Sequence, residues 1–162
     1  MLELLLQWDE AGLKFVNQVF TNSFFDWFFP NITDLHDTLF FKVILVPALL
    51  LTLIYKYKKK GLALFFMLLV SLGISDGLGN YGFKKTFQRP RPHTITELNI
   101  IQRSPSAGFS FISNHSTNMF NFATYLSAFF PQYKILLYSM ASLVAYSRVY
   151  NGAHYPSDVF LG

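Results

Sequence analysis

The sequence predicts an all-α polytopic membrane protein: a bundle of about five to six transmembrane helices led by an N-terminal amphipathic interfacial helix. Three observations predict this class. Hydrophobic residues make up 52% of the 162 residues and charged residues only 14%, whereas soluble domains average about 25% charged residues. Long apolar runs alternate with polar segments. Phenylalanine occurs 19 times, which suits a surface facing lipid. We expect residues 1–162 to form a single membrane-embedded domain.

The first element is an amphipathic helix over residues 2–20. Apolar residues such as Leu6, Leu13 and Phe20 alternate at helical spacing with polar residues such as Glu10 and Asn17. This pattern favours a helix that lies on the membrane over one that crosses it. The stretch TNSFFDWFFP follows, and its aromatic residues are typical of the membrane–water interface.

Two transmembrane spans are predicted in the first half of the chain. The first covers residues 37–56, about 20 residues and therefore long enough to cross the hydrocarbon layer, with a kink expected at Pro47. The second covers residues 61–83 and contains Asp76 and Asn80. Because polar groups are costly in lipid, the face that carries them should point into the protein, where we expect them to form structural hydrogen bonds.

The second half predicts two shorter spans and the start of another. A long polar stretch, 84–113, separates the second span from spans at 115–130 and 133–149. A fifth span begins at Pro156, but only a few of its residues precede Gly162. We therefore expect the C-terminal span to be incomplete in this chain.

The distribution of lysines predicts the orientation. A cluster lies between the first two spans, and by the positive-inside rule this loop is cytoplasmic: Lys56, Lys58, Lys59 and Lys60. Counting spans then places the polar stretch 84–113, the start of the third span and the turn 147–158 together on the opposite face. Several basic residues lie on that outer face against the rule, which indicates that they have a function.

Overall composition narrows the function. The net charge of +4 suits anionic lipid or phosphate partners. The basic residues are scattered between apolar runs, which argues against nucleic acid as a partner. The chain contains no cysteine, so disulfides and thiolate metal sites are excluded.

Three cations gather at the predicted outer face. Lys84 and Arg91 belong to KKTFQRPRP, and Arg148 belongs to SRVYNGAHYPSD, in which Asp158 is the only carboxylate. Such a cluster repels itself unless it holds an anion, and arginine matches the oxygens of phosphate. Ser113 and Asn114 come just before a helix that begins near His115, so free backbone N–H groups there would add to anion binding.

Two histidines are candidates for chemistry. His154 and Asp158 are four residues apart, and with Pro156 in the first turn of a helix their side chains lie on one face. A carboxylate beside an imidazole fixes its tautomer and stabilises its cationic form, which leaves the other ring nitrogen as a nucleophile toward phosphorus. His115 comes from another helix and is better suited to protonate a leaving oxygen.

The three motifs together resemble the type 2 phosphatidic acid phosphatases. The pattern K-x6-R-P, S-x-H and S-R-x5-H-x3-D occurs in order between Lys84 and Asp158. One departure is Ile112-Ser113-Asn114-His115, where the family pattern has Pro-Ser-Gly-His. Asn114 still offers its backbone N–H there.

The resemblance implies a single phosphatase domain that hydrolyses phosphate esters without metal or other cofactor. It implies that His154 becomes a phosphohistidine, that Asp158 supports it and that His115 is the general acid. The phosphoryl oxygens would be held by Lys84, Arg91, Ser113, Asn114 and Arg148. The partners implied are a phosphorylated membrane lipid and the bilayer, with no obligate protein partner.

The resemblance also implies a bacterial inner-membrane, multi-pass enzyme with its active site facing the periplasm. Among possible substrates it favours lipid A 1-phosphate, followed by undecaprenyl diphosphate or phosphatidylglycerol phosphate. Two other interpretations stay open. His115, His154 and Asp158 would form a two-histidine, one-carboxylate metal site, although the flanking cations oppose a divalent ion. Alternatively, the chain is a non-catalytic lipid-binding or transport protein.

Other polar residues receive plainer interpretations. Arg89 can exchange roles with Arg91, but the spacing from Lys84 favours Arg91. His36 and His93 match no motif and are expected at the surface.

Overall fold

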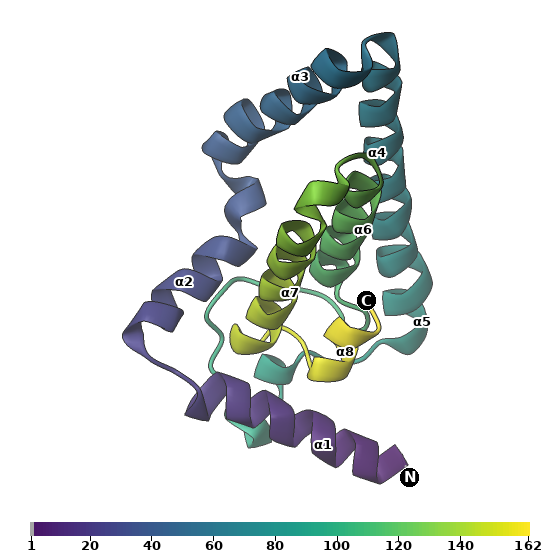
Figure 1. Ribbon diagram of the computed structural model, residues 1–162. Coiled ribbons are helices and arrows are strands. Elements are labelled where there is room, and N and C mark those ends of the chain that lie inside the picture. The colour runs from purple at the N-terminus through teal and green to yellow at the C-terminus, as the bar shows by residue number, and fades with distance from the viewer. Residues whose placement is uncertain (1) are drawn as a thin grey trace.

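The computed structural model describes residues 2–162, and all regular elements there are helices (Figure 1). The α-helices are α1 (Leu2–Lys14), α2 (Ser23–Thr33), α3 (Val46–Tyr57), α4 (Lys59–Gly77), α5 (Lys85–Phe87), α6 (Asn114–Phe129), α7 (Lys134–Tyr150) and α8 (Pro156–Phe160). π-helical turns at Phe15–Val19, Phe41–Leu45 and Leu78–Lys84 extend α1, precede α3 and join α4 to α5. Short 3₁₀ turns lie at Leu35–Asp37, Pro92–Thr94, Thr96–Leu98 and Pro131–Tyr133. The prediction of an all-α fold is confirmed.

Two helical hairpins form the body of the molecule. The α3–α4 hairpin opens as a V, and the antiparallel α6–α7 hairpin lies inside it, with α6 packed against α4 (Figure 1). Leu53, Leu68, Leu126 and Phe130 are buried together where the hairpins meet. The two hairpins therefore share one apolar core at the end of the molecule away from α1.

The helices coincide closely with the predicted spans. Agreement in position does not by itself show that each helix crosses a membrane. Helix α6 matches the prediction 115–130, and α7 matches 133–149. Within residues 2–162, the helical stretch Lys59–Thr94 is long and apolar enough to cross a membrane. Large apolar side chains are exposed on the outer faces of α3, α4 and α7, including Leu51, Phe66 and Ile135. The number of five to six spans remains a prediction.

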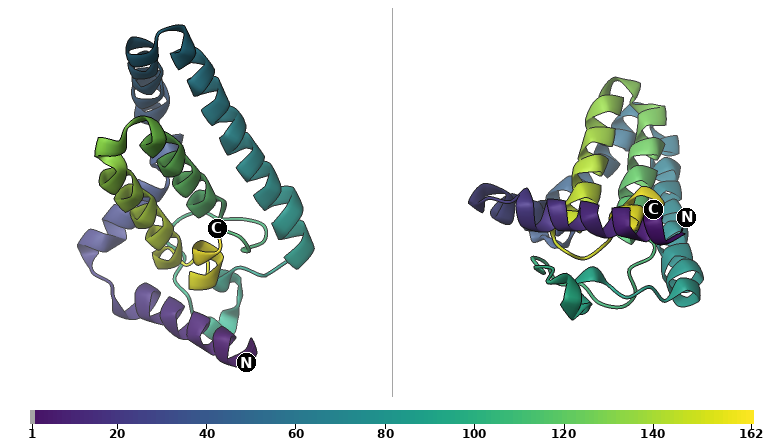
Figure 2. Two further views of the ribbon diagram at one scale, coloured as in Figure 1. Left: turned by 45° about the vertical axis from the view of Figure 1, so that its right-hand side comes forward. Right: turned by 90° about the horizontal axis from the view of Figure 1, so that it is seen from below.

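Helix α1 lies across the end of the molecule opposite the α3–α4 turn (Figures 1 and 2). Its apolar Trp8 and the following Phe15 are exposed, whereas the polar Asp9 and Asn17 are buried. The Asn17 side chain donates to the carbonyls of Ile101 and Tyr150 at 2.9 and 2.8 Å. The buried side of this helix carries Asp9 and Asn17 together with the apolar Leu13, and its outward side carries exposed aromatic residues. This orientation suits a membrane interface, which remains a prediction.

One glycine shapes the turn between α7 and α8. Gly152 has φ +72°, a conformation that non-glycine residues rarely adopt. The turn lets the N–H groups of Ala153 and His154 both donate to the carbonyl of Arg148, at 3.1 and 3.2 Å. The chain thereby folds back on the last turn of α7 and sets His154 beside it.

We expect Gly152→Ala to destabilise the protein by about 2 kcal/mol or more, because a left-handed alanine is strained. The new Cβ would also lie 2.7 Å from both Ile100 Cγ2 and Ile101 O. Thermal unfolding in detergent measures the effect. Gly73→Ala is the matched control, since its Cβ meets nothing within 4 Å and alanine favours a helix. Equal unfolding midpoints for the two variants would show that the turn does not require glycine.

Candidate active site

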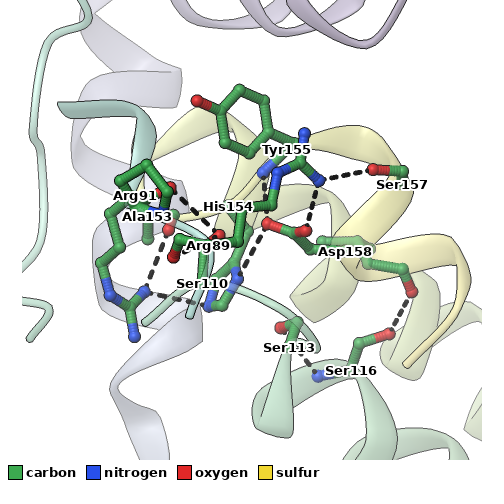
Figure 3. A network of polar contacts seen from close by, with 12 residues as sticks. Arg89, Arg91, Ser110, Ser113, Ser116, Ala153, His154, Tyr155, Ser157 and Asp158 are labelled. Carbon is green, nitrogen blue, oxygen red and sulfur yellow. Dashed lines mark hydrogen bonds and ion pairs between the residues drawn. The ribbon is translucent and has the colours of Figure 1, made fainter. Parts of the chain in front are cut away.

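The structure brings the three motifs together around α8. Figure 3 shows Arg91 directed at one side of the His154 ring and Asp158, at the start of α8, on the other side. The backbone N–H of Ser113 donates to the carbonyl of Asp158 at 3.0 Å, which fixes the N-terminus of α6 against α8. Segments far apart in the sequence therefore contribute to one cluster.

His154 and Asp158 form the centre of the cluster. Their side chains are 2% and 0% exposed, and His154 Nδ1 lies 3.6 Å from Asp158 Oδ2. The carboxylate is held in place because its Oδ2 accepts the backbone N–H of Tyr155 at 3.0 Å, as a residue in the first turn does in a capping box. Pro156 starts the helix at a position where its missing N–H has no cost. The start of α8 thus aims a carboxylate at the imidazole.

Arg91 contacts the other ring nitrogen of His154. Its Nη1 lies 3.1 Å from His154 Nε2 and donates to the carbonyl of Ala153 at 2.9 Å. Because a guanidinium can only donate, Nε2 accepts and the ring proton resides on Nδ1, facing Asp158. The remaining contacts of Arg91 are to the carbonyls of Ala107 and Gly108, at 2.8 to 3.1 Å. Nε2 therefore carries a lone pair directed at a cation.

The surroundings of His154 keep it neutral. Burial lowers its pKa to about 4, although Asp158 acts in the opposite direction and raises it. Arg91 and Arg148 lower the pKa further by their charge. At neutral pH the imidazole therefore has an unprotonated nitrogen available for attack.

Arg148 lies in the last turn of α7 and is 2% exposed. Its Nη1 donates to Thr33 Oγ1 at 2.9 Å and lies 4.0 Å from Asp34 Oδ1. Its Nε is buried and has no hydrogen-bond partner within residues 2–162. A buried donor without a partner is costly, so this arginine retains capacity for an anion.

Lys84 is held by the polar residues predicted inside the second span. Its Nζ donates to Asn80 Oδ1 at 3.2 Å, and Asn80 Nδ2 donates to Asp76 Oδ2 at 3.0 Å. Lys84 lies within range of the charges of Arg91, Arg148 and Asp158. The hydrogen bonds predicted for Asp76 and Asn80 therefore orient one of the cations of the site.

Ser113 and Asn114 begin α6, but their groups are used differently from the sequence prediction. The backbone N–H of Ser113 donates to the carbonyl of Asp158, and the Ser113 Oγ accepts the N–H of Ser116 at 3.4 Å. The Asn114 side chain donates to Asp76 Oδ1 at 2.7 Å. It also fills the space beside Gly79, where any Cβ would overlap its Oδ1. The asparagine that replaces the family glycine is thus accommodated by α4, which leaves its backbone N–H for an anion.

His115 lies against a residue that the sequence did not assign to the site. Its ring packs edge-on against His36, with centroids 5.2 Å apart and an interplanar angle of 77°. The expectation that His36 is an ordinary surface residue is therefore incomplete, since a half-exposed ring contacts the candidate acid. His93 is half-buried, and its Nδ1 donates to the carbonyl oxygen of Gly152 at 3.1 Å. Neither histidine lies in a motif, so only the fold reveals these contacts.

Arg89 and Arg91 have separate places. Arg91 contacts His154, whereas Arg89 Nη1 donates to Asp158 Oδ1 at 2.6 Å (Figure 3). No group of three or more His, Asp or Glu side chains in residues 2–162 is arranged to hold a metal ion. The metal-site interpretation of His115, His154 and Asp158 gains no support from this geometry.

Comparisons with known proteins agree with the motifs. The family model described as the PAP2 superfamily matches residues 60–162. The lipid A 4'-phosphatase of Porphyromonas gingivalis is 34% identical over 128 residues, which cover 74% of this chain and 54% of that protein. The lipid A 1-phosphatase of Rhizobium johnstonii is 33% identical over 106 residues, which cover 63% and 41%. The chain thus spans about half the length of these curated relatives.

The fold has a solved counterpart. The crystal structure of Aquifex aeolicus LpxE superposes with a TM-score of 0.72 at 25% identity, covering 93% of this chain and 85% of that one. The matched region contains all three motifs and every residue of the cluster except those contributed by the first two helices and the segment that follows them. On the family match, the motifs and the common fold, this chain belongs to the PAP2 superfamily.

Proposed function

We propose that this chain is an integral-membrane lipid phosphatase that acts through a phosphohistidine on His154. The observation that carries the proposal is the placement of the His154 imidazole between opposite charges. Its Nδ1 faces Asp158 and its Nε2 faces Arg91. The charge of Arg148 acts on the same ring, and Lys84 lies within range of the charges of Arg91, Arg148 and Asp158. A group that attacks an anionic centre benefits from such an arrangement.

In the first step, Nε2 attacks the phosphorus and the bond from phosphorus to the lipid oxygen breaks. His115, protonated in the complex with the phosphate dianion, gives its proton to the departing oxygen. The imidazole becomes cationic, and Asp158 stabilises that charge through Nδ1–H. Arg91 then exchanges its hydrogen bond with Nε2 for one with a phosphoryl oxygen.

In the second step, water attacks the phosphohistidine and the P–N bond breaks. His115 accepts a proton from this water, and inorganic phosphate leaves. The equatorial oxygens are held by Lys84, Arg91 and Arg148, with the backbone N–H groups at the start of α6. Every proton and electron pair is accounted for by these groups, with no metal or cofactor in the scheme.

We propose that the substrate is a phosphate of lipid A, at the periplasmic face of a bacterial inner membrane. The 1-phosphate is the position favoured by the sequence, and the R. johnstonii relative bears the corresponding name. The 4'-phosphate is a second candidate, because the P. gingivalis relative matches a larger share of this chain. The membrane side rests on the lysine cluster between α3 and α4, at the end opposite α8 (Figure 1).

We expect His154→Ala to abolish turnover and the trapped phosphoenzyme, because no other group takes the phosphoryl. Asp158→Asn should leave substrate binding nearly intact but slow attack, since the favoured tautomer changes. His115→Ala should lower kcat most for substrates with poor leaving groups, because their departure needs the proton. Rapid-quench trapping of acid-labile phosphate, with His93→Gln as control and with a chelator present, measures these effects. Labelled phosphate on His115, or wild-type activity in His154→Ala, would contradict the assignment.

The pH dependence follows from the lowered pKa of His154. Because that pKa is about 4 in place of 6.5, the neutral nucleophile persists through the mildly acidic range. We therefore expect the part of kcat/KM due to His154 to fall only as the pH approaches about 4. The profile must be corrected for the ionisation of the substrate phosphate. A fall centred on the ordinary histidine value would show that His154 is solvated in the working enzyme.

The substrate is decided by phosphate release from purified lipids in detergent. The panel contains lipid A with only the 1-phosphate, lipid A with only the 4'-phosphate, undecaprenyl diphosphate and phosphatidylglycerol phosphate. We expect a lipid A species to give the highest kcat/KM. Preference for either of the other two lipids would overturn the lipid A proposal but not the reaction class. Binding of all of them without release of phosphate would favour a lipid-binding or transport protein.

A further inference from the structure

We propose that Asp9, on α1, is a positioning residue for the nucleophile, acting through Arg89 and Asp158. The inference rests on the proposed function of His154 and adds two residues to it. None of the three phosphatase motifs includes Asp9 or assigns a role to Arg89.

Arg89 joins two carboxylates. Its Nη1 donates to Asp158 Oδ1 at 2.6 Å, and its Nη2 donates to Asp9 Oδ2 at 2.6 Å. Asp158 is 0% exposed and Asp9 is 7% exposed. Short, charge-assisted hydrogen bonds between buried partners are among the stronger polar contacts in proteins. A continuous path of contacts therefore runs from α1 to the imidazole of His154.

Asp9 also holds the start of α8 directly. Its Oδ1 accepts the backbone N–H of Ser157 at 2.8 Å, and its Oδ2 accepts Ser157 Oγ at 2.6 Å. Ser157 Oγ in turn accepts from Arg89 Nη1 at 2.8 Å. Ser157 precedes Asp158, so one carboxylate of α1 fixes both the backbone and the ion pair of the residue that faces His154.

Arg89 is constrained on a further side. The ring of Tyr155 lies 3.7 Å from its guanidinium carbon, a stacked cation–π contact. The arginine therefore has one orientation, in which both ends of its fork are occupied. If Asp9 lost its charge, the whole positive charge of Arg89 would bear on Asp158, and Asp158 would stabilise the cationic imidazole less.

The charge balance explains why a second carboxylate is needed. The Oδ2 atom of Asp158 faces His154, and its Oδ1 atom pairs with Arg89. A lone arginine against Asp158 would neutralise it, whereas an arginine shared with Asp9 leaves part of the carboxylate charge for the histidine. Asp9 thus adjusts how strongly Asp158 supports the nucleophile, besides orienting it.

Asp9→Asn tests the proposal, with Asp26→Asn as the matched control. Asp26 also accepts from an arginine, Arg103 Nε at 2.7 Å, but it pairs with the end of α7 through Tyr150 and has no contact with His154. We expect Asp9→Asn to lower kcat by about 10- to 100-fold, as loss of an outer hydrogen-bonding partner does at other sites. KM should change by less than about threefold, since the phosphate ligands are intact. Asp26→Asn should leave kcat within about twofold.

A second variant separates positioning from folding. We expect Arg89→Ala to lose most activity and to regain part of it when guanidinium ion is added, because the small cation can occupy the gap between the two carboxylates. Asp9→Asn and Asp26→Asn should unfold at similar temperatures in detergent. A wild-type kcat in folded Asp9→Asn would overturn the proposal, as would losses of kcat in both variants that follow their losses of stability.

An activity-independent measurement keeps this inference distinct from the proposed function. The ¹⁵N chemical shifts of the His154 ring report the proton on Nδ1, in a protein whose other three histidines are replaced. We expect Asp9→Asn to shift them and Asp26→Asn not to. If the wild-type protein releases no phosphate from any substrate, the proposed function fails while the shift still decides the positioning role. An unchanged spectrum in Asp9→Asn overturns that role alone.

Discussion

The end of the molecule that carries the motifs depends on keeping the charged carboxylate of Asp158 buried. An unpaired carboxylate in such a place would cost several kcal/mol, so its partners have to be supplied from several parts of the chain. Tyr155 gives a backbone N–H, Arg89 gives a guanidinium and His154 gives an imidazole. Because Ser113 binds the carbonyl of the same residue, the N-terminus of α6 is placed by Asp158 as well.

The cations present the opposite problem. Lys84, Arg91 and Arg148 lie near one another, and none makes an ion pair with Asp158. Arg91 is partly satisfied by backbone carbonyls, and Arg148 by a threonine hydroxyl and a more distant Asp34. The three cationic side chains are therefore hydrogen-bonded, but their charge is incompletely balanced by carboxylates. An anion could balance the remaining charge. Most acceptors of these cations are neutral, so much of their charge is left to interact with an anion.

Much of the fold and of the candidate site follows from local patterns. The apolar runs gave the limits of α6 and α7 within one or two residues, and the spacing of the motifs separated Arg91 from Arg89. The contacts of Asp9 with Ser157 could not be predicted, because they join residues 148 positions apart in the sequence. For the same reason the burial of Asn17, a polar residue in the predicted interfacial helix, is visible only when the helix is set against the rest of the protein. A sequence pattern shows which face of a helix is polar, but not whether water or protein groups form the hydrogen bonds of that face.

The two carbonyls that accept hydrogen bonds from Arg91 limit how loops can be exchanged between related proteins. Ala107 and Gly108 belong to the long polar segment between α5 and α6, which lies at the end of the molecule that carries α1 and α8 (Figure 2). The segment that we expect to contact the lipid headgroup thus also holds the arginine beside His154 in place. A chimaera that imports another headgroup loop must therefore reproduce two backbone oxygens, whatever side chains it brings. Divergence toward new lipids is easiest at positions of this loop that leave its path beside Arg91 unchanged.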